Sequence, residues 1–132
     1  MMPEKAGSEL MEFFFDTYAI IEFLKSNPRF QSYFNKKGIT SRLNLMEVYF
    51  QVLKIEGEQK ADTVHASFSV CCEDYDEHLM KEAMKFRLRM MLNGKDVSYA
   101  DAIGYQMALK KGLKFLTGDK EFRGMENIEF VR

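Results

Sequence analysis

The sequence has few of the residues that cross-link or interrupt a chain: two cysteines, two prolines and no tryptophan among 132 residues. The cysteines, Cys71 and Cys72, are adjacent. Adjacent side chains of a strand point to opposite faces of a sheet, so this pair provides no disulfide framework. Such cysteine usage favours a reducing compartment.

An excess of charge is lacking too, because 19 Lys and Arg residues nearly balance 20 Asp and Glu residues, for a formal net charge of −1. The molecule as a whole does not attract a polyanion, so any contact with nucleic acid relies on local basic patches or on metal ions. Long apolar runs are also missing: no stretch approaches the roughly 20 residues of a membrane span, and the N-terminal run is too short for a signal peptide. The sequence therefore predicts a cytoplasmic protein without a membrane partner.

What is present is an ordinary globular composition, with 46% hydrophobic and 30% charged residues. A chain of this length buries enough surface for a hydrophobic core without cross-links. No repeat, low-complexity run or linker divides it. We therefore expect a single domain over residues 1–132, of which 1–9 form a flexible tail.

Short apolar runs alternate with helical patterns along the chain. We expect strands at 10–15, 38–41, 68–72, 113–116 and 128–131, and helices at 17–26, 28–34, 42–55, 58–66, 76–93 and 98–111. Strands that alternate with helices predict the α/β class, with a parallel sheet covered by helices on both faces.

Two acids follow directly on predicted strands. Asp16 comes after the run FFF, and Asp119 comes after LKFLTG. In open parallel sheets, sites form beyond the carboxyl ends of the strands, where the strand order reverses. If the two strands are neighbours, both carboxylates share one crevice. Each also has a purely structural interpretation, with Asp16 as a helix N-cap and Asp119 as a turn residue.

Three further acids lie in predicted helices. Asp101 falls three residues after Ser98, a spacing typical of a capping box, and an acid in the first turn suits the helix dipole. Glu47 lies among apolar neighbours in RLNLMEVYFQVL, where burial is costly unless a metal ion or a basic partner compensates the charge. Glu22 lies on the polar side of its helix, and we interpret it as a solvated residue.

Four of these acids, Asp16, Glu47, Asp101 and Asp119, come from distant segments and suit a Mg²⁺ or Mn²⁺ site. Hard cations prefer oxygen ligands. Such a site activates water and neutralises the charge that builds on a phosphodiester. Carboxylates held close together repel one another unless a cation or a shared proton intervenes.

The segments that carry these acids resemble those of PIN-domain proteins. FFFDTYAIIEFL is similar to the opening of the family, SRLNLMEVYFQVL to its Glu-bearing helix, and SYADAIGYQMALKKGLKFLTGDKEF to its segment with Asp-Ala and Thr-x-Asp. The resemblance runs in order over residues 13–131. It implies a three-layer α/β/α sandwich with a parallel sheet of about five strands, and a ribonuclease site that uses one or two divalent metal ions. The positions that match the family pattern are the acids Asp16, Glu47, Asp101 and Asp119 and the hydroxyl residues Thr17 and Thr117. Tyr18 departs from the small polar residue often found at its place.

Small members of this kind resemble VapC-type toxins, which an antitoxin blocks near the acids and which commonly form homodimers. The resemblance therefore implies RNA as substrate, an antitoxin as partner and a homodimer. By position, the substrate contacts are Lys120 and Arg123, which follow Asp119, and Arg42, which precedes Glu47.

Three other functions are alternatives to this interpretation. A metal-free ribonuclease needs acid and base groups near neutral pKa, and only His65 and His78 are available. A phospho-signalling receiver also gathers acids around Mg²⁺, but its first strand is followed by adjacent acids, whereas here a single Asp is followed by Thr. A PIN-like interaction module without catalysis is the third, although clustered carboxylates with no ligand would cost stability.

Overall fold

The computed structural model describes residues 11–132, so the predicted tail 1–9 and the first residue of the predicted strand 10–15 lie outside the described residues. Its strands are β1 (Phe13–Phe15), β2 (Gly38–Ser41), β3 (Cys72–Glu73), β4 (Lys114–Thr117) and β5 (Ile128–Phe130). They form one five-stranded sheet in the order β3-β2-β1-β4-β5, and every neighbouring pair is parallel. The predicted parallel sheet of about five strands is confirmed.

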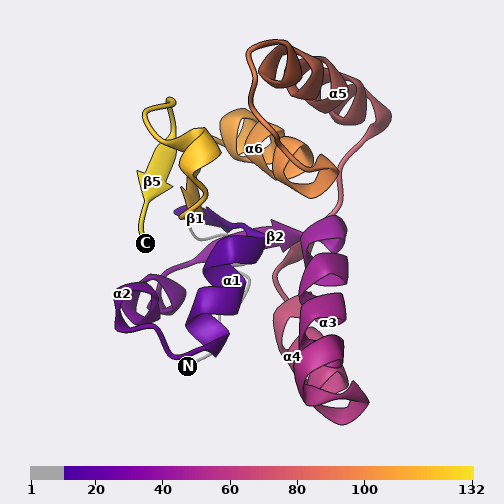
Figure 1. The fold of residues 1–132 in the computed structure, drawn as a ribbon, viewed down its shortest axis with the longest axis vertical. Helices are drawn as coiled ribbons and strands as arrows, with labels where there is room; N and C mark the ends of the chain where they lie inside the picture. The colour runs from indigo at the N-terminus through magenta and orange to yellow at the C-terminus, as the bar shows by residue number, and fades with distance from the viewer. Residues whose placement is uncertain (1–10) are drawn as a thin grey trace.

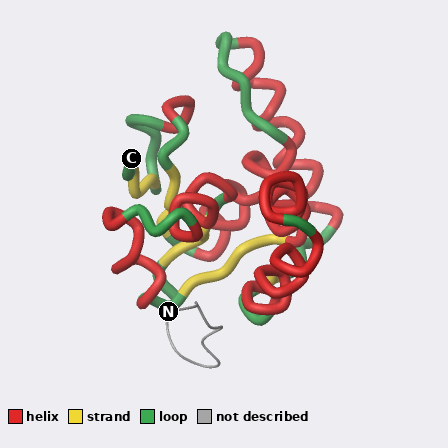
Figure 2. The backbone as a smooth tube through the Cα atoms, turned by 60° about the horizontal axis from the view of Figure 1, so that its bottom comes forward, coloured by secondary structure: helices red, strands yellow, loops and turns green. Residues whose placement is uncertain are grey.

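The helices cover both faces of this sheet, which makes the three-layer sandwich. They are α1 (Thr17–Leu24), α2 (Pro28–Gln31), α3 (Arg42–Glu56), α4 (Glu58–Ser69), α5 (Glu77–Leu92) and α6 (Tyr99–Lys111), with 3₁₀ turns η1 (Ser32–Asn35) and η2 (Lys120–Phe122). In Figure 1, α5 and α6 lie on one side of the sheet and α1 to α4 on the other. Figure 2 shows the strands in the middle of the molecule with helices around them. None of the helices within residues 11–132 combines the length and the hydropathy that crossing a membrane requires.

Consecutive residues of the central strands supply the two cores. Phe14 and Phe115 stack on each other, with ring centroids 5.6 Å apart, in the core beneath α5 and α6. Phe15 and Leu116, the next residues along, lie in the opposite core, where Phe15 stacks on Phe34 at 4.3 Å. Successive strand side chains point to opposite faces, so an unbroken apolar run buries both. This explains why Phe13–Phe15 in β1 and the pair Phe115 and Leu116 in β4 are consecutive apolar residues rather than alternating with polar ones.

The predicted strand 68–72 is wrong. Helix α4 continues to Ser69, and β3 comprises only Cys72–Glu73. Phe68 is fully buried on the same helical face as Ala61 and Val64, at spacings of seven and four residues. That helical period outweighs the β-propensity of FSVCC, because packing decides the local structure.

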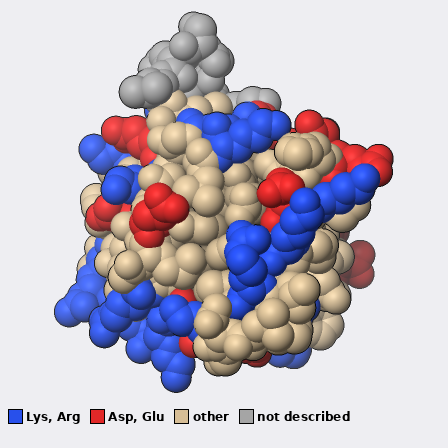
Figure 3. Space-filling view, turned by 90° about the horizontal axis from the view of Figure 1, so that it is seen from above, with Lys and Arg blue, Asp and Glu red and all other residues tan. Residues whose placement is uncertain are grey.

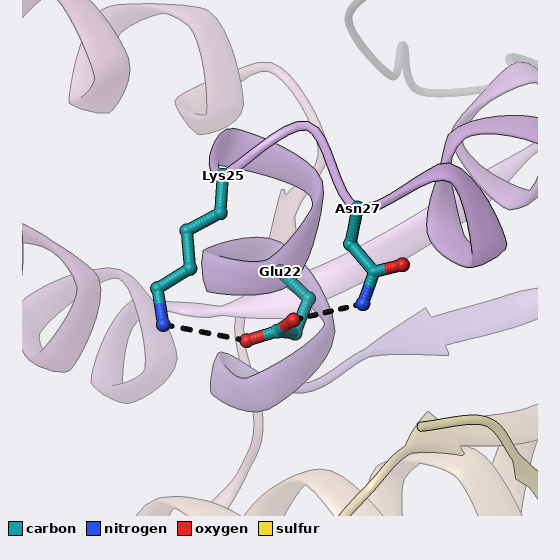
Figure 4. Close-up of polar contacts among 3 residues, drawn as sticks. All are labelled: Glu22, Lys25 and Asn27. Atoms are coloured by element: carbon teal, nitrogen blue, oxygen red, sulfur yellow. Dashed lines mark hydrogen bonds and ion pairs between the residues drawn. The ribbon is translucent and has the colours of Figure 1, made fainter.

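Helix α1 ends two residues before its predicted end, at a turn held by Glu22. One carboxylate oxygen accepts a hydrogen bond from Asn27 Nδ2 at 2.9 Å, and the other lies 3.5 Å from Lys25 Nζ (Figure 4). Between them, Ser26 adopts a positive φ of 64°, which ends the helix. The side chain of Glu22 is only 21% exposed, so our interpretation of it as a solvated residue is corrected.

The sheet topology creates one position suited to a functional site, at the carboxyl ends of two neighbouring strands. From β1 the chain builds β2 and β3 on one side and then returns to place β4 on the other. The order therefore reverses between β1 and β4, the point where open parallel sheets form a crevice at their carboxyl ends. The amide of Asp16, just past β1, donates to the carbonyl of Leu116 in β4 at 3.3 Å.

Candidate active site

A cavity of about 820 Å³ opens where β1 and β4 end, and we call it the acid cavity. It is lined by Asp16, Glu47, Asp101 and Asp119. These residues come from the end of β1, the middle of α3, the first turn of α6 and the residues after β4. Segments up to a hundred residues apart in sequence thus bring their carboxylates to a single space.

Asp16 is the most deeply buried of the four, with 1% of its surface exposed. It caps α1, because its Oδ1 accepts a hydrogen bond from the Ala19 amide at 2.8 Å. Burial raises the pKa of Asp16 well above its ordinary value, and the nearby charges of Asp101 and Asp119 raise it further. Hydrogen bonds from Thr117 and Ala19 partly oppose that rise. The structural interpretation as a cap and the placement in the cavity therefore both hold.

Asp101 is held in the cavity by the start of α6. Its amide donates to Ser98 Oγ at 3.0 Å, so Ser98 is the N-cap that the spacing predicts. Burial, followed by the charges of Glu47 and Asp119, raises the pKa of Asp101 to about 7. Burial and the neighbouring negative charges thus both disfavour the ionised form of Asp101.

Glu47 is half-buried, and its environment differs from the one predicted. Its neighbours Met46 and Phe50 are 61% and 59% exposed, so the apolar stripe around it does not lie in the core. Glu47 Oε1 accepts a hydrogen bond of 2.6 Å from Thr17 Oγ1. A neutral hydroxyl, rather than the basic partner considered above, therefore positions this carboxylate.

A buried asparagine that the sequence analysis overlooked supports this contact. Asn44 Nδ2 donates to Thr17 Oγ1 at 3.1 Å, and Asn44 Oδ1 accepts from Ser41 Oγ at 2.6 Å. The chain of hydrogen bonds runs from the end of β2 through α3 to the start of α1. Its signal in the sequence is a polar Asn three residues before Glu47 on an otherwise apolar turn of helix.

Asp119 and Thr117 form the side of the cavity that follows β4. The amide of Asp119 donates to Thr117 Oγ1, and Asp119 Oδ1 accepts from the Glu121 amide, both at 3.0 Å. Asp119 thereby caps the 3₁₀ turn η2. Thr117 is fully buried and contacts both Asp16 and Asp119 by hydrogen bonds.

Of the three basic residues predicted to contact RNA, only Lys120 lines the acid cavity. Arg42 lines a different cavity and lies 3.4 Å from Asp74. The guanidinium of Arg123 lies over the Phe130 ring, 4.6 Å from its centroid.

One basic residue of the acid cavity was not predicted from the sequence. Arg132 lines it, and its Nε donates to the carbonyl of Gly118 at 2.9 Å. Its own main-chain oxygen accepts from Arg29 Nη1 at 3.0 Å. Nothing in the residues around Arg132 signals this placement, because it depends on β5 lying beside β4.

Tyr18, the departure from the family pattern, also lines the acid cavity without displacing Asp16 from its cap. Its ring lies against Gly118, where a Cβ would collide with both the Tyr18 ring and the carbonyl oxygen of Val131. Position 118 therefore needs glycine for space, and the large residue at 18 depends on the smallest residue at 118.

The chemistry of these residues fits a hard divalent cation. Carboxylate oxygens are the ligands that Mg²⁺ and Mn²⁺ prefer, and a cation would offset the burial and the neighbouring negative charges that raise the pKa of Asp16 and Asp101. Within residues 11–132, no three His, Cys, Asp or Glu side chains stand as a ready-made metal-binding group. The carboxylates are thus of the type that binds such an ion, but their oxygens are not already arranged around one position.

Comparison with known proteins identifies the class. The family model of the PIN domain matches residues 13–127, and the chain belongs to the PIN-domain family. A comparison with curated protein sequences gives no match.

Solved structures of toxin–antitoxin proteins have the same fold. VapC20 of Mycobacterium tuberculosis, described as a sarcin–ricin loop cleaving toxin, superposes with a TM-score of 0.74 and 21% identity over 92% of this chain and 99% of that one. DNA-bound VapBC from Salmonella typhimurium gives 0.72 and 21% over 92% and 98%. A toxin–antitoxin complex from Klebsiella pneumoniae gives 0.71 and 18% over 89% and 96%.

Proposed function

We propose that this protein is a divalent-metal-dependent endoribonuclease that hydrolyses RNA phosphodiester bonds, and that it is the toxin of a toxin–antitoxin pair. The observation that carries the proposal is the convergence of Asp16, Glu47, Asp101 and Asp119 on one cavity at the switch point of the sheet. Membership of the PIN-domain family, a family of nucleases, supports it. That membership leaves the phospho-signalling receiver without support.

The four carboxylates are the proposed ligands of Mg²⁺ or Mn²⁺. When bound, such an ion activates water and neutralises charge on the phosphodiester. Thr17 and Asn44 fix the orientation of Glu47, and Thr117 fixes Asp16 and Asp119. Hydrolysis by this route leaves a 5′-phosphate and a 3′-hydroxyl.

The proposed phosphate contacts are Lys120 and Arg132, since both line the acid cavity. The Nε of Arg132 is held by Gly118, which leaves its terminal nitrogens for a phosphate oxygen. Arg42 and Arg123 are assigned to more distant parts of the substrate. On the face seen in Figure 3, Lys and Arg side chains form separate bands with acidic side chains beside them. Attraction of RNA is therefore assigned to local contacts rather than to the net charge.

The positions of the two histidines argue against a ribonuclease mechanism that uses acid and base groups without a metal ion. His65 lies beside Tyr49 and outside the acid cavity, and His78 is exposed in the first turn of α5. A metal-free ribonuclease needs such groups within hydrogen-bond reach of the scissile bond.

The partners follow from the structural neighbours. Two of them are toxin–antitoxin complexes, which supports an antitoxin as partner of this chain. We extend the proposal to a homodimer that acts in the cytoplasm, where the free thiols of Cys71 and Cys72 stay reduced.

RNA cleavage tests the proposal directly. Purified protein with Mn²⁺ should cleave a structured RNA to products with 5′-phosphate ends, and EDTA should abolish cleavage. Asp101→Asn should lower the rate by roughly 10²-fold or more, since it removes a charge proposed to hold the metal. The matched control is Glu22→Gln, an acid outside the acid cavity, which should cleave at the wild-type rate.

Metal binding gives a second readout. Mn²⁺ at about a hundredfold excess over its dissociation constant should stabilise the wild type by roughly 2.7 kcal/mol, and Asp101→Asn far less. Cleavage that persists in EDTA, or in Asp101→Asn, would contradict the proposal. Absence of both cleavage and Mn²⁺ stabilisation would leave the PIN-like interaction module as the function.

A further inference from the structure

A second cavity, of about 750 Å³, lies on the other side of α3, and we call it the aromatic cavity. Its lining includes Tyr49, His65, Tyr75, Arg42 and Asp74. Met46 lines this cavity and the acid cavity alike, so one exposed side chain of α3 is the ridge between them. A strand of RNA that crosses this ridge reaches both.

The rings of the aromatic cavity are held in place before any ligand arrives. The Tyr49 hydroxyl donates to Asp62 Oδ1 at 2.7 Å, and the His65 ring meets Tyr49 edge-on, with centroids 6.1 Å apart. The hydrogen bond to Asp62 raises the pKa of Tyr49, so the phenol stays protonated as the donor. Tyr75 is half-buried and packs against the core beneath α5 and α6. Fixed rings lose little conformational entropy when a flat ligand stacks on them.

The charges of the aromatic cavity select a neutral ligand. Arg42 is 3.4 Å from Asp74, and their side chains are 75% and 85% exposed, so this pair is weak and readily exchanged. Asp74, the one carboxylate among the described residues that line this cavity, repels a phosphate but can accept a hydrogen bond from an amino group. Aromatic faces, apolar walls and a carboxylate acceptor together suit a heterocyclic base with an exocyclic amino group.

We propose that the aromatic cavity binds an unpaired nucleobase of the RNA strand whose phosphodiester lies in the acid cavity. This inference rests on the proposed ribonuclease function and narrows its substrate to RNA that is single-stranded beside the cleavage point. The volume of the cavity lies within the range of small-ligand sites. A base inside a duplex cannot enter it, because its faces are covered by stacking and its edge is paired.

Photochemical crosslinking tests the proposal without relying on cleavage. A short single-stranded RNA with one 5-iodocytidine, whose base carries an exocyclic amino group, is irradiated with the Asp101→Asn protein, with and without Mg²⁺, and the attached peptide is mapped. The expected attachment is to Tyr49, His65 or Tyr75, with the yield falling at least several-fold for the same RNA in a duplex. Attachment only outside these residues, or equal yield from the duplex, would overturn the proposal.

Substitutions of the rings test the same contact by affinity. Tyr49→Leu and Tyr75→Leu should each weaken binding of the single-stranded RNA by roughly 5-fold or more, the usual contribution of one stacked base. Tyr49→Phe keeps the ring and should bind nearly as the wild type does. The matched control is Tyr99→Leu, an aromatic residue that is 60% exposed outside both cavities, which should leave binding unchanged. Thermal unfolding of each variant identifies any that fails to fold.

The outcomes separate this inference from the function on which it rests. Normal cleavage with unchanged affinity in folded Tyr49→Leu and Tyr75→Leu would refute base binding and leave the nuclease standing. Crosslinks in the aromatic cavity without any cleavage would support base binding and refute hydrolysis. If Tyr49→Leu instead dissociates a dimer and leaves RNA affinity unchanged, the cavity is an interface between copies and the proposal is wrong.

Discussion

Helix α3 separates two cavities of similar volume and opposite character. The acid cavity, about 820 Å³, gathers four carboxylates from four parts of the chain, whereas the aromatic cavity, about 750 Å³, carries three rings and one exposed ion pair. The acid cavity concentrates like charge where burial makes charge expensive, which raises the pKa of Asp16 and Asp101. The polar contacts of the aromatic cavity, by contrast, are complementary pairs.

The contrast shows which of the two cavities would be stabilised by a bound ion. Burial, and then the charges of neighbouring carboxylates, raise the pKa of Asp16 and of Asp101, so a cation would relieve both groups. In the aromatic cavity, the Tyr49 hydroxyl already donates a hydrogen bond to Asp62, and the His65 ring packs edge-on against Tyr49. The same helix thus has one side set for a charged ligand and another set for a flat neutral one.

The dependence of stability on pH gives the largest effect expected from this contrast. Asp101 has a folded-state pKa of about 7, against roughly 3.9 in an unfolded chain. The folded state therefore retains a proton that the unfolded state has lost, so stability is greatest below about pH 4 and falls as pH rises through 7. In EDTA, the wild type should lose roughly 2–3 kcal/mol more than Asp101→Asn between pH 5 and pH 8 in urea unfolding.

A carboxylate of the aromatic cavity supplies the control for this measurement. Asp74 is exposed, and Asp74→Asn should show the same pH dependence as the wild type. If the free energy of unfolding depends on pH equally in the wild type and in Asp101→Asn, the comparison fails, because ionisation of Asp101 would then cost the folded state nothing extra.

Removal of a supporting hydroxyl should have a smaller effect, confined to the acid cavity. Thr17→Val keeps the shape of the side chain but removes the donor to Glu47 and the acceptor of Asn44. Partners of metal ligands usually contribute about 10-fold or more to affinity or rate, so the cleavage rate and the Mn²⁺ affinity should fall roughly 10-fold. Thr17→Ser should restore both. Tyr49→Phe, which removes the corresponding hydrogen bond of the aromatic cavity, should leave the Mn²⁺ affinity unchanged.

The smallest effects concern one arginine from each cavity. Arg132→Ala should lower kcat by about 5-fold, because its guanidinium is held beside the carboxylates by Gly118, and Arg132→Lys should recover part of the loss. Arg42→Ala should change KM by about 2-fold and leave kcat alone, since an exposed ion pair contributes little. A larger loss of kcat from Arg42 than from Arg132 would reverse the assignment of the two cavities.

The parts of the fold that sequence predicted are those with a local signal. The short runs FFF at 13–15 and LKFL at 113–116 predicted strands, and the acids that follow them marked the carboxyl edge of the sheet. Ser98 before Asp101 marked the start of α6. The meeting of these acids in one cavity followed once β1 and β4 were taken as neighbours, which the strand order confirms.

The parts that sequence could not predict depend on packing between distant segments. Arg42 precedes Glu47 by five positions, and on a helix of 3.6 residues per turn that spacing turns the two side chains toward different sides of α3. Arg132 reaches the acid cavity only because β5 lies beside β4. The apolar neighbours of Glu47 looked like core residues, but hydrophobicity alone does not say whether Met46 and Phe50 face the interior.

The strand order also governs what happens while the protein is being made. The central strand β1 pairs on one side with β2, which comes next among the strands in the sequence. On its other side it pairs with β4, where Phe13 lies opposite Lys114, a residue synthesised much later. Chains fold from the N-terminus as they emerge from the ribosome, so a nascent chain carries Asp16 and Glu47 long before Asp119 exists. Any product that stops before β4 thus lacks a complete acid cavity and leaves β1 with an unpaired edge, the kind of surface on which chains aggregate. Synthesis of β4 and of the residues after it is therefore the step that pairs the second side of β1 and brings the last carboxylate to the acid cavity.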